Sequence, residues 1–189
     1  PIADKMTMMI VAILMSAQGM LPIWLAVVIV FRDAIIVAGA AYDALTLTIP
    51  NWISLALLGL FPLLAIGSGL GAGEAGIHLA VGVAALLAGM GLFAANIIGG
   101  GDAKLFAAVA LYVGLGSISS YILAVTFAGG ILAIVILALR WLATSPYGAF
   151  VPFRLPAPTG GIPYGIAIAA GGLFVFPATH FFLLVTSAA

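Results

Sequence analysis

The sequence predicts an all-α fold, a polytopic membrane helix bundle of about six to seven spans. Of the 189 residues, 66% are hydrophobic and only 5% are charged, whereas a soluble domain carries about 25% charged residues. Several apolar runs approach the roughly 20 residues that a helix needs to cross a bilayer. These runs lack the alternation of apolar and polar residues typical of membrane β-barrels, so the spans are expected to be helices.

The apolar runs are separated by breaks rich in glycine, proline and polar residues. The expected spans are 6–20, 22–41, 52–70, 77–97, 105–116, 118–139 and 163–185. The run at 105–116 is short for a full span, so it is either tilted or continuous with part of the next run. The longest break, 140–163, holds five of the ten prolines and is the largest expected loop, extramembrane or re-entrant.

Charge and cysteine content exclude several classes of function. The net charge is zero and no basic cluster is present, so nucleic acid is not an expected partner. The absence of cysteine excludes disulfides, thiolate metal sites and a cysteine nucleophile. No cofactor is predicted.

The order of the spans indicates on which side of the membrane each charged residue lies. Asp43 and Asp102 are separated by two crossings and therefore share one face, whereas Glu74 lies on the other. Two further crossings bring Arg140 and Arg154 to the aspartate face, where Lys104 also lies. Because cytoplasmic loops are enriched in lysine and arginine, the aspartate face is expected to be cytoplasmic.

Two of the five acidic residues, Asp43 and Asp102, lie at the ends of apolar spans. An ionisable group at membrane depth is costly and suggests a functional site. The alternative is that both are solvated at headgroup level and have no role. The glycines before Asp102, residues 99–101, allow backbone angles and close approaches that other residues do not. Such irregular backbone is tolerated in a membrane where it lines a cavity, although a glycine run can also be a simple hinge.

Two carboxyl groups held close together would share one proton, because like charges at close range do not both ionise. One carboxylate can then act as general base and the other as general acid. Such a pair can activate a water molecule against a peptide carbonyl and protonate the leaving amine. This chemistry requires no metal ion and no cysteine.

Three stretches resemble a known family. "YDALTLTIPNWISL" at 42–55 and "IGGGDAKL" at 98–105 are similar to the two aspartate motifs of prepilin peptidases, which are GxGD-type intramembrane aspartic proteases. The likeness is strongest to the short Flp/Tad-type members. "TGGIPYGIAIAAGGL" at 159–173 resembles the last span of the family, so that the resemblance covers about 40–189.

The resemblance implies an aspartic endopeptidase with Asp43 and Asp102 as catalytic residues. Gly99 and Gly101 would be the fixed glycines of the GxGD motif, and Lys104 would have a supporting role. The implied substrate is a Flp-like type IV prepilin, whose leader peptide is removed at the cytoplasmic face of the bacterial inner membrane. The pilus assembly machinery is then a further expected partner. Because the chain lacks the cysteine cluster found in larger members, cleavage without N-methylation is expected.

Other polar residues have less specific interpretations. Lys104 could stabilise the ionised form of Asp102, hold a substrate carboxylate, or only extend to the membrane surface. Pro50 and Asn51 are expected to form a turn and cap the next helix. His78 is expected to be a packing residue, and His180 is expected on the face away from the aspartates.

Residues 1–40 resemble part of the CDP-alcohol phosphatidyltransferases, so the chain is expected to consist of this membrane segment and a prepilin-peptidase-like membrane domain at 41–189. Only Asp4, followed by Lys5, matches the acidic signature of those enzymes. A multi-acid metal site cannot be replaced by one carboxylate, so no phosphotransferase activity is expected.

Arg32 and Asp33 would lie in the middle of a span, and as adjacent helix residues they are not expected to form an ion pair.

Three alternative functions remain open from sequence. The first is a fragment of a CDP-alcohol phosphatidyltransferase. The second is a transporter or channel that uses the acids as proton or cation sites. The third is a GxGD enzyme that cuts within the bilayer. The interval of 59 residues from Asp43 to Asp102, together with the Ile-Pro-Asn turn at 49–51, favours the prepilin class.

Overall fold

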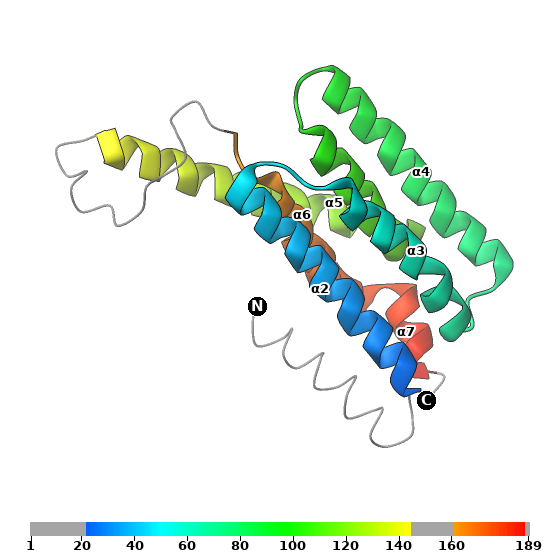
Figure 1. Ribbon diagram of the computed structural model, residues 1–189. Coiled ribbons are helices and arrows are strands. Elements are labelled where there is room, and N and C mark those ends of the chain that lie inside the picture. Colours follow the sequence, from blue (N-terminus) through cyan, green and yellow to red (C-terminus); the bar gives the residue numbers. More distant parts are fainter. Residues whose placement is uncertain (1–21, 145–160, 188–189) are drawn as a thin grey trace.

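The computed structural model describes residues 22–144 and 161–187, and the regular elements in these ranges are all helices. They are α2 (Ile23–Thr46), α3 (Asn51–Gly67), α4 (Ala72–Ala94), α5 (Gly100–Thr144), α6 (Tyr164–Val175), the 3-10 helix η2 (Phe176–Ala178) and α7 (His180–Ser187) (Figure 1). The all-α prediction is confirmed. The expected span at 6–20 and the residues Asp4 and Arg154 lie outside the described ranges.

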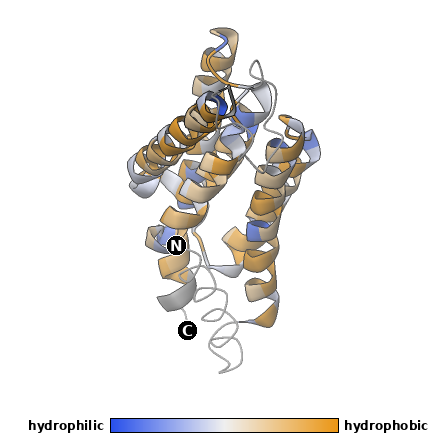
Figure 2. Cartoon of the chain, turned by 90° about the vertical axis from the view of Figure 1, so that its left-hand side faces the viewer, coloured by the Kyte–Doolittle hydropathy of each residue, from blue (hydrophilic) through white to orange (hydrophobic). Residues whose placement is uncertain are grey.

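The helices are mostly hydrophobic along their lengths (Figure 2), and many large apolar side chains are exposed on the outside of the bundle. Large side chains such as Leu45, Ile66 and Phe174 are 85%, 78% and 73% exposed. The segments Ile23–Thr46, Ala72–Ala94 and Gly100–Leu142 are long and apolar enough to cross a membrane, and α3 and Tyr164–Ala178 are shorter apolar segments. A surface of this kind is unsuited to water, which agrees with the predicted membrane bundle.

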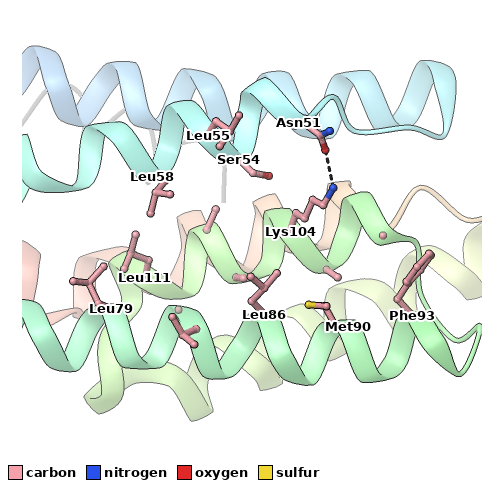
Figure 3. Close-up of a pocket in the computed structure, with 16 residues that line it drawn as sticks. Asn51, Ser54, Leu55, Leu58, Leu79, Leu86, Met90, Phe93, Lys104 and Leu111 are labelled. Carbon is pink, nitrogen blue, oxygen red and sulfur yellow. Dashed lines mark hydrogen bonds between the residues drawn. The ribbon is translucent and has the colours of Figure 1, made fainter.

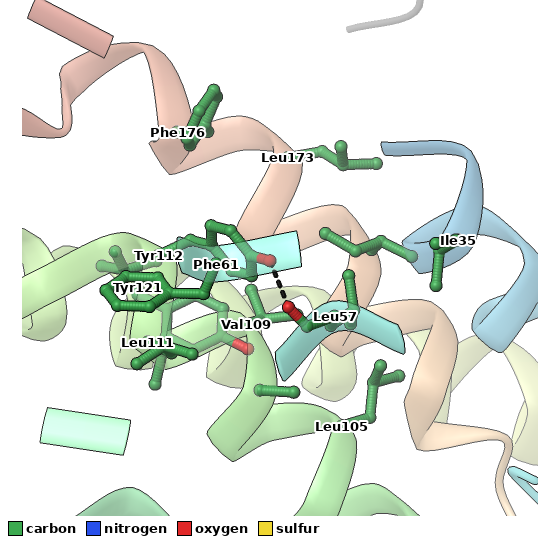
Figure 4. Close-up of a cluster of buried hydrophobic side chains, with 14 of the residues drawn as sticks. Ile35, Leu57, Phe61, Leu105, Val109, Leu111, Tyr112, Tyr121, Leu173 and Phe176 are labelled. Carbon is green, nitrogen blue, oxygen red and sulfur yellow. Dashed lines mark hydrogen bonds between the residues drawn. The ribbon is translucent and has the colours of Figure 1, made fainter. Parts of the chain in front are cut away.

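The core lies where α2, α3, α5 and α6 meet (Figure 4). Ile36, Ile53, Leu57 and Leu105 have no exposed surface. The Tyr112 hydroxyl donates a hydrogen bond to the carbonyl oxygen of Leu57, which ties α5 to α3. This packing holds the end of α2 beside the start of α5, and those two ends carry Asp43 and Asp102.

Helix α5 is sharply bent at Gly114, where φ is 71° and ψ is 177°. Only glycine readily adopts these angles. The ring of His78 fills the space beside it, and its Nδ1 lies 2.7 Å from the carbonyl oxygen of Leu111, so Nδ1–H donates to that oxygen. His78 is buried, as expected of a packing residue. The runs at 105–116 and 118–139 thus form two helical parts of α5 that meet at a sharp kink at Gly114.

The expected single run at 163–185 is instead broken into α6, η2 and α7. Pro177 lies at the break, where it cannot donate a backbone hydrogen bond to continue α6. Thr179 then caps α7: its backbone is extended, and its hydroxyl oxygen accepts the N–H of Phe182 at 3.4 Å. The break turns α7 back so that Phe181 packs against Phe61 and His78.

Arg32 and Asp33 do form an ion pair, which corrects the expectation from sequence. Arg32 is 1% exposed, and its Nη2 lies 2.7 Å from Asp33 Oδ1. The long arginine side chain lets its head fold back to the neighbouring carboxylate. The guanidinium carbon also lies 3.5 Å from the centroid of the Phe176 ring, a close cation–π contact that links α2 to the end of α6.

Candidate active site

Asp43 lies in the last turn of α2 and is 4% exposed. Its Oδ2 accepts a hydrogen bond of 2.6 Å from the backbone N–H of Gly165. Gly165 is in the first turn of α6, where backbone N–H groups have no partner within the helix. The N-terminus of α6 therefore faces Asp43 with the N–H of Gly165 and a partial positive charge.

Asp102 lies in the first turn of α5. Its Oδ2 accepts the backbone N–H of Gly99 at 3.3 Å, which is the side-chain half of a capping box. Its Oδ1 is buried and has no hydrogen-bond partner in the described part of the chain. Ile49 packs against both Gly101, which precedes Asp102, and Gly165, whose N–H is bonded to Asp43. The structure thus brings the two predicted site aspartates together, each held by one backbone N–H.

The loop between α2 and α3 packs between the two aspartates. Leu47 ends α2 in a left-handed conformation, with φ at 54°, and its N–H bonds to the carbonyl oxygen of Asp43 at 2.8 Å. Ile49 is then buried against two glycines. A Cβ on Gly101 would lie 3.1 Å from Ile49 Cβ, and a Cβ on Gly165 would lie 3.1 Å from Ile49 Cδ1. The absence of side chains at these glycines allows the loop to fit.

Each predicted motif glycine has a distinct steric role. A Cβ on Gly99 would lie 2.8 Å from Asp102 Oδ2, so a side chain there would displace the carboxylate. At Gly101, the absence of a side chain instead leaves room for Ile49. Gly165 was not singled out from sequence, although a Cβ there would lie 2.9 Å from both Cβ and Oδ2 of Asp43. The sequence around Gly165 contains several other glycines, so nothing local distinguished this one. Its proximity to Asp43 comes from the tertiary fold.

Lys104 lies one turn beyond the start of α5 and is exposed. Its Nζ donates a 2.8 Å hydrogen bond to Oδ1 of Asn51, the first residue of α3. Pro50 holds the N-cap position without any side-chain cap, so the turn is as expected but the capping role of Asn51 is wrong. In the described ranges Lys104 forms no ion pair, and its positive charge faces only a neutral amide.

The remaining predicted residues lie elsewhere. His180 Nδ1 is 3.9 Å from Glu74 Oε1, at the end of the bundle away from the aspartates, as expected. Among residues 22–144 and 161–187, no group of three or more histidine, aspartate or glutamate side chains is placed to hold a metal ion.

Comparison with known proteins gives one match. The sequence profile of the type IV leader peptidase family matches residues 33–138, more than half of the chain. The matched range contains both aspartates, the glycines at 99 and 101 and Lys104. It begins inside the stretch 1–40 that resembled a phosphatidyltransferase, and no comparison supports that resemblance. No curated protein and no solved structure matches the chain.

Proposed function

The chain belongs to the type IV leader peptidase family, and on that premise we propose that it is an aspartic endopeptidase that removes the leader peptide of Flp-like type IV prepilins. Asp43 and Asp102 are the proposed catalytic pair. The observation that carries this proposal is the convergence of the two carboxyl groups at the facing ends of α2 and α5, beside the start of α6.

The surroundings of the two aspartates suggest which one acts as general base and which one as general acid. The N–H of Gly165 and the N-terminus of α6 stabilise negative charge on Asp43. Asp102 Oδ1 is buried without a donor, which favours a proton on that carboxyl group. Asp43 would therefore take a proton from water as the water oxygen bonds to the peptide carbonyl carbon. Asp102 would protonate the carbonyl oxygen to give a gem-diol. As the C–N bond breaks, Asp43 would give its proton to the leaving nitrogen and Asp102 would take a proton back from one hydroxyl, which leaves a carboxylic acid product and restores the starting pair.

Cleavage of a Flp-type prepilin by the purified chain in liposomes tests this proposal. Mass spectrometry of the products should show a single cut between leader and mature pilin, with no added metal or cofactor. Cuts inside the apolar segment would instead favour an enzyme that cleaves within the bilayer. If a folded preparation cuts no prepilin, the proposed function is wrong.

Replacing Gly165 by alanine should reduce cleavage by about 10²-fold, because a shift of about 1 Å in a catalytic group has an effect of this order. The new Cβ would press on Asp43 and lengthen the 2.6 Å hydrogen bond from residue 165. Steady-state cleavage rates measure the effect. Gly59→Ala is a suitable control, because nothing lies within 4 Å of a Cβ there. Equal rates for both variants would contradict the assigned role of Gly165.

The proposed cytoplasmic orientation has its own test. Arg140 Nη2 donates to the carbonyl oxygen of Gly161 at 3.2 Å, and Gly161 precedes the helix that contacts Asp43. Basic charge thus gathers at the aspartate end. Because the chain has no cysteine, single cysteines can report topology. Ile97→Cys should react with a membrane-impermeant maleimide only in permeabilised cells, whereas Gly73→Cys should react in intact spheroplasts. The reverse pattern would place the site outside.

A further inference from the structure

A groove of about 720 Å³ lies between α3 and α4, with α5 as its floor (Figure 3). Both α3 and α4 pack on α5 but make little contact with each other. The groove runs from Leu79 and Leu111 at one end to Phe93 and Lys104 at the other (Figure 3). The floor from Gly100 to Leu111 corresponds to about 16 Å of helix, or roughly three turns.

The two ends of the groove differ in polarity. Most of its length is lined by side chains such as Leu58, Leu86 and Met90. Its polar side chains, Asn51, Ser54 and Lys104, all lie toward one end (Figure 3). Ser54 Oγ is buried and has no hydrogen-bond partner in the described part of the chain. This end therefore offers a hydroxyl, an amide and a cation to whatever occupies the groove.

The polar end adjoins the aspartates. Gly100, Ala103 and Lys104 line the groove, and they flank Asp102 in the first turns of α5. Asp102 itself does not line the groove and lies on another face of α5, so a chain lying along the groove would reach it by crossing the first turn of α5 at the polar end. A backbone must be extended to be cut, and its N–H and C=O groups then lose their helical partners. In a membrane such groups require polar partners from the protein.

We propose that this groove binds the apolar helix of the precursor, with the backbone next to the cut site unwound against Asn51, Ser54 and Lys104. This inference rests on the proposed function. A lipid acyl chain would match the apolar walls but would leave Ser54 Oγ unpaired, whereas a peptide backbone would satisfy it. The uncompensated charge of Lys104 also suits the carbonyl oxygens or a carboxylate of a peptide.

Tryptophan substitutions test the groove with controls on the same helices. Leu58 and Leu86 line the groove, whereas Leu63 on α3 and Leu87 on α4 are exposed but do not. Leu58→Trp and Leu86→Trp should lower kcat/KM for the full prepilin by roughly tenfold or more, mainly through KM, because the added bulk fills the groove. Leu63→Trp and Leu87→Trp should stay within about twofold of the parent chain.

A second substrate separates docking from chemistry. A short peptide that spans the cut site but lacks the apolar helix should be cleaved equally by all four tryptophan variants and the parent. If the groove variants cleave full prepilin as fast as the controls, the inference is overturned. If the groove variants lose activity equally on both substrates, the substitutions disturb the catalytic pair rather than the binding of the apolar helix. The inference is then also overturned.

Disulfide crosslinking tests whether the precursor helix binds in the groove even if no cleavage occurs. A wrong binding site can therefore be distinguished from a wrong proposed function. The chain has no cysteine, so Leu86→Cys and Leu87→Cys can each be oxidised in liposomes with a prepilin carrying one cysteine in its apolar segment. A crosslink at residue 86 but not at 87 supports the proposal. Equal crosslinking at both positions, or none at 86, would overturn the inference.

Discussion

Asp43→Asn and Asp102→Asn are each expected to reduce prepilin cleavage by about 10² to 10⁴-fold, the range typical of a lost general acid or base. Asparagine keeps the shape of aspartate. Its amide oxygen can still accept the N–H of Gly165 at position 43 or the N–H of Gly99 at position 102. The substitution therefore removes the shared proton while leaving the local hydrogen bond in place.

The measurement is the rate of leader release in liposomes, with the melting temperature of each variant recorded in parallel. Glu74→Gln is the matched control, because this carboxylate lies near His180 at the opposite end of the bundle. It should cleave at the parent rate. An aspartate variant that cleaves as fast as the parent would remove that residue from the proposed pair, whereas loss in both variants with intact folding would support it.

Gly114→Ala is expected to destabilise the bundle by about 2 to 5 kcal/mol, the combined size of a strained backbone and an overpacked core. Alanine does not readily adopt φ of 71° with ψ of 177°. Its Cβ would also lie 2.4 Å from Cε1 of the buried His78 ring. Relief would require moving α4 away from α5 or straightening the bend, and either movement disturbs the hydrogen bond between His78 and Leu111.

Thermal unfolding in detergent, followed by tryptophan fluorescence or by loss of soluble protein on heating, measures this effect. Gly116→Ala provides the control two residues away, since nothing lies within 4 Å of a Cβ there. Alanine is the better helix former, so this control should be unchanged or slightly stabilised, by at most about 1 kcal/mol. Equal melting of the two variants would show that the bend at Gly114 is not needed for stability.

The features that sequence predicted are those fixed by local composition. Continuous apolar runs are enough to predict an all-α membrane bundle, and the resemblance of the two aspartate motifs to those of a known family suggested the peptidase. The order of spans also placed His180 at the end of the bundle away from the aspartates. Each of these predictions depends on residues close together in the chain or on counting the spans between them.

The features that sequence missed depend on contacts between distant residues. Gly165 meets Asp43 only because α6 packs against α2. The Arg32–Asp33 ion pair was rejected because adjacent helix residues point in different directions, but a long side chain buried under Phe176 can turn back to its neighbour. The break of the last run at Phe176–Ala178 was missed because Pro177 lies in an otherwise apolar sequence.

The two contacts between α2 and residues 165–176 have a consequence for biosynthesis. Arg32 contacts Phe176 and Asp43 contacts Gly165, and these pairs are eleven residues apart on both segments. On insertion scales, an arginine at the centre of a span, where Arg32 lies in α2, costs about 2.5 to 3.5 kcal/mol. Because synthesis proceeds from the N-terminus, α2 enters the bilayer before Phe176 and Gly165 have been translated. A nascent chain thus carries both aspartates without the N–H that holds Asp43, and this contact can form only after Gly165 has been translated.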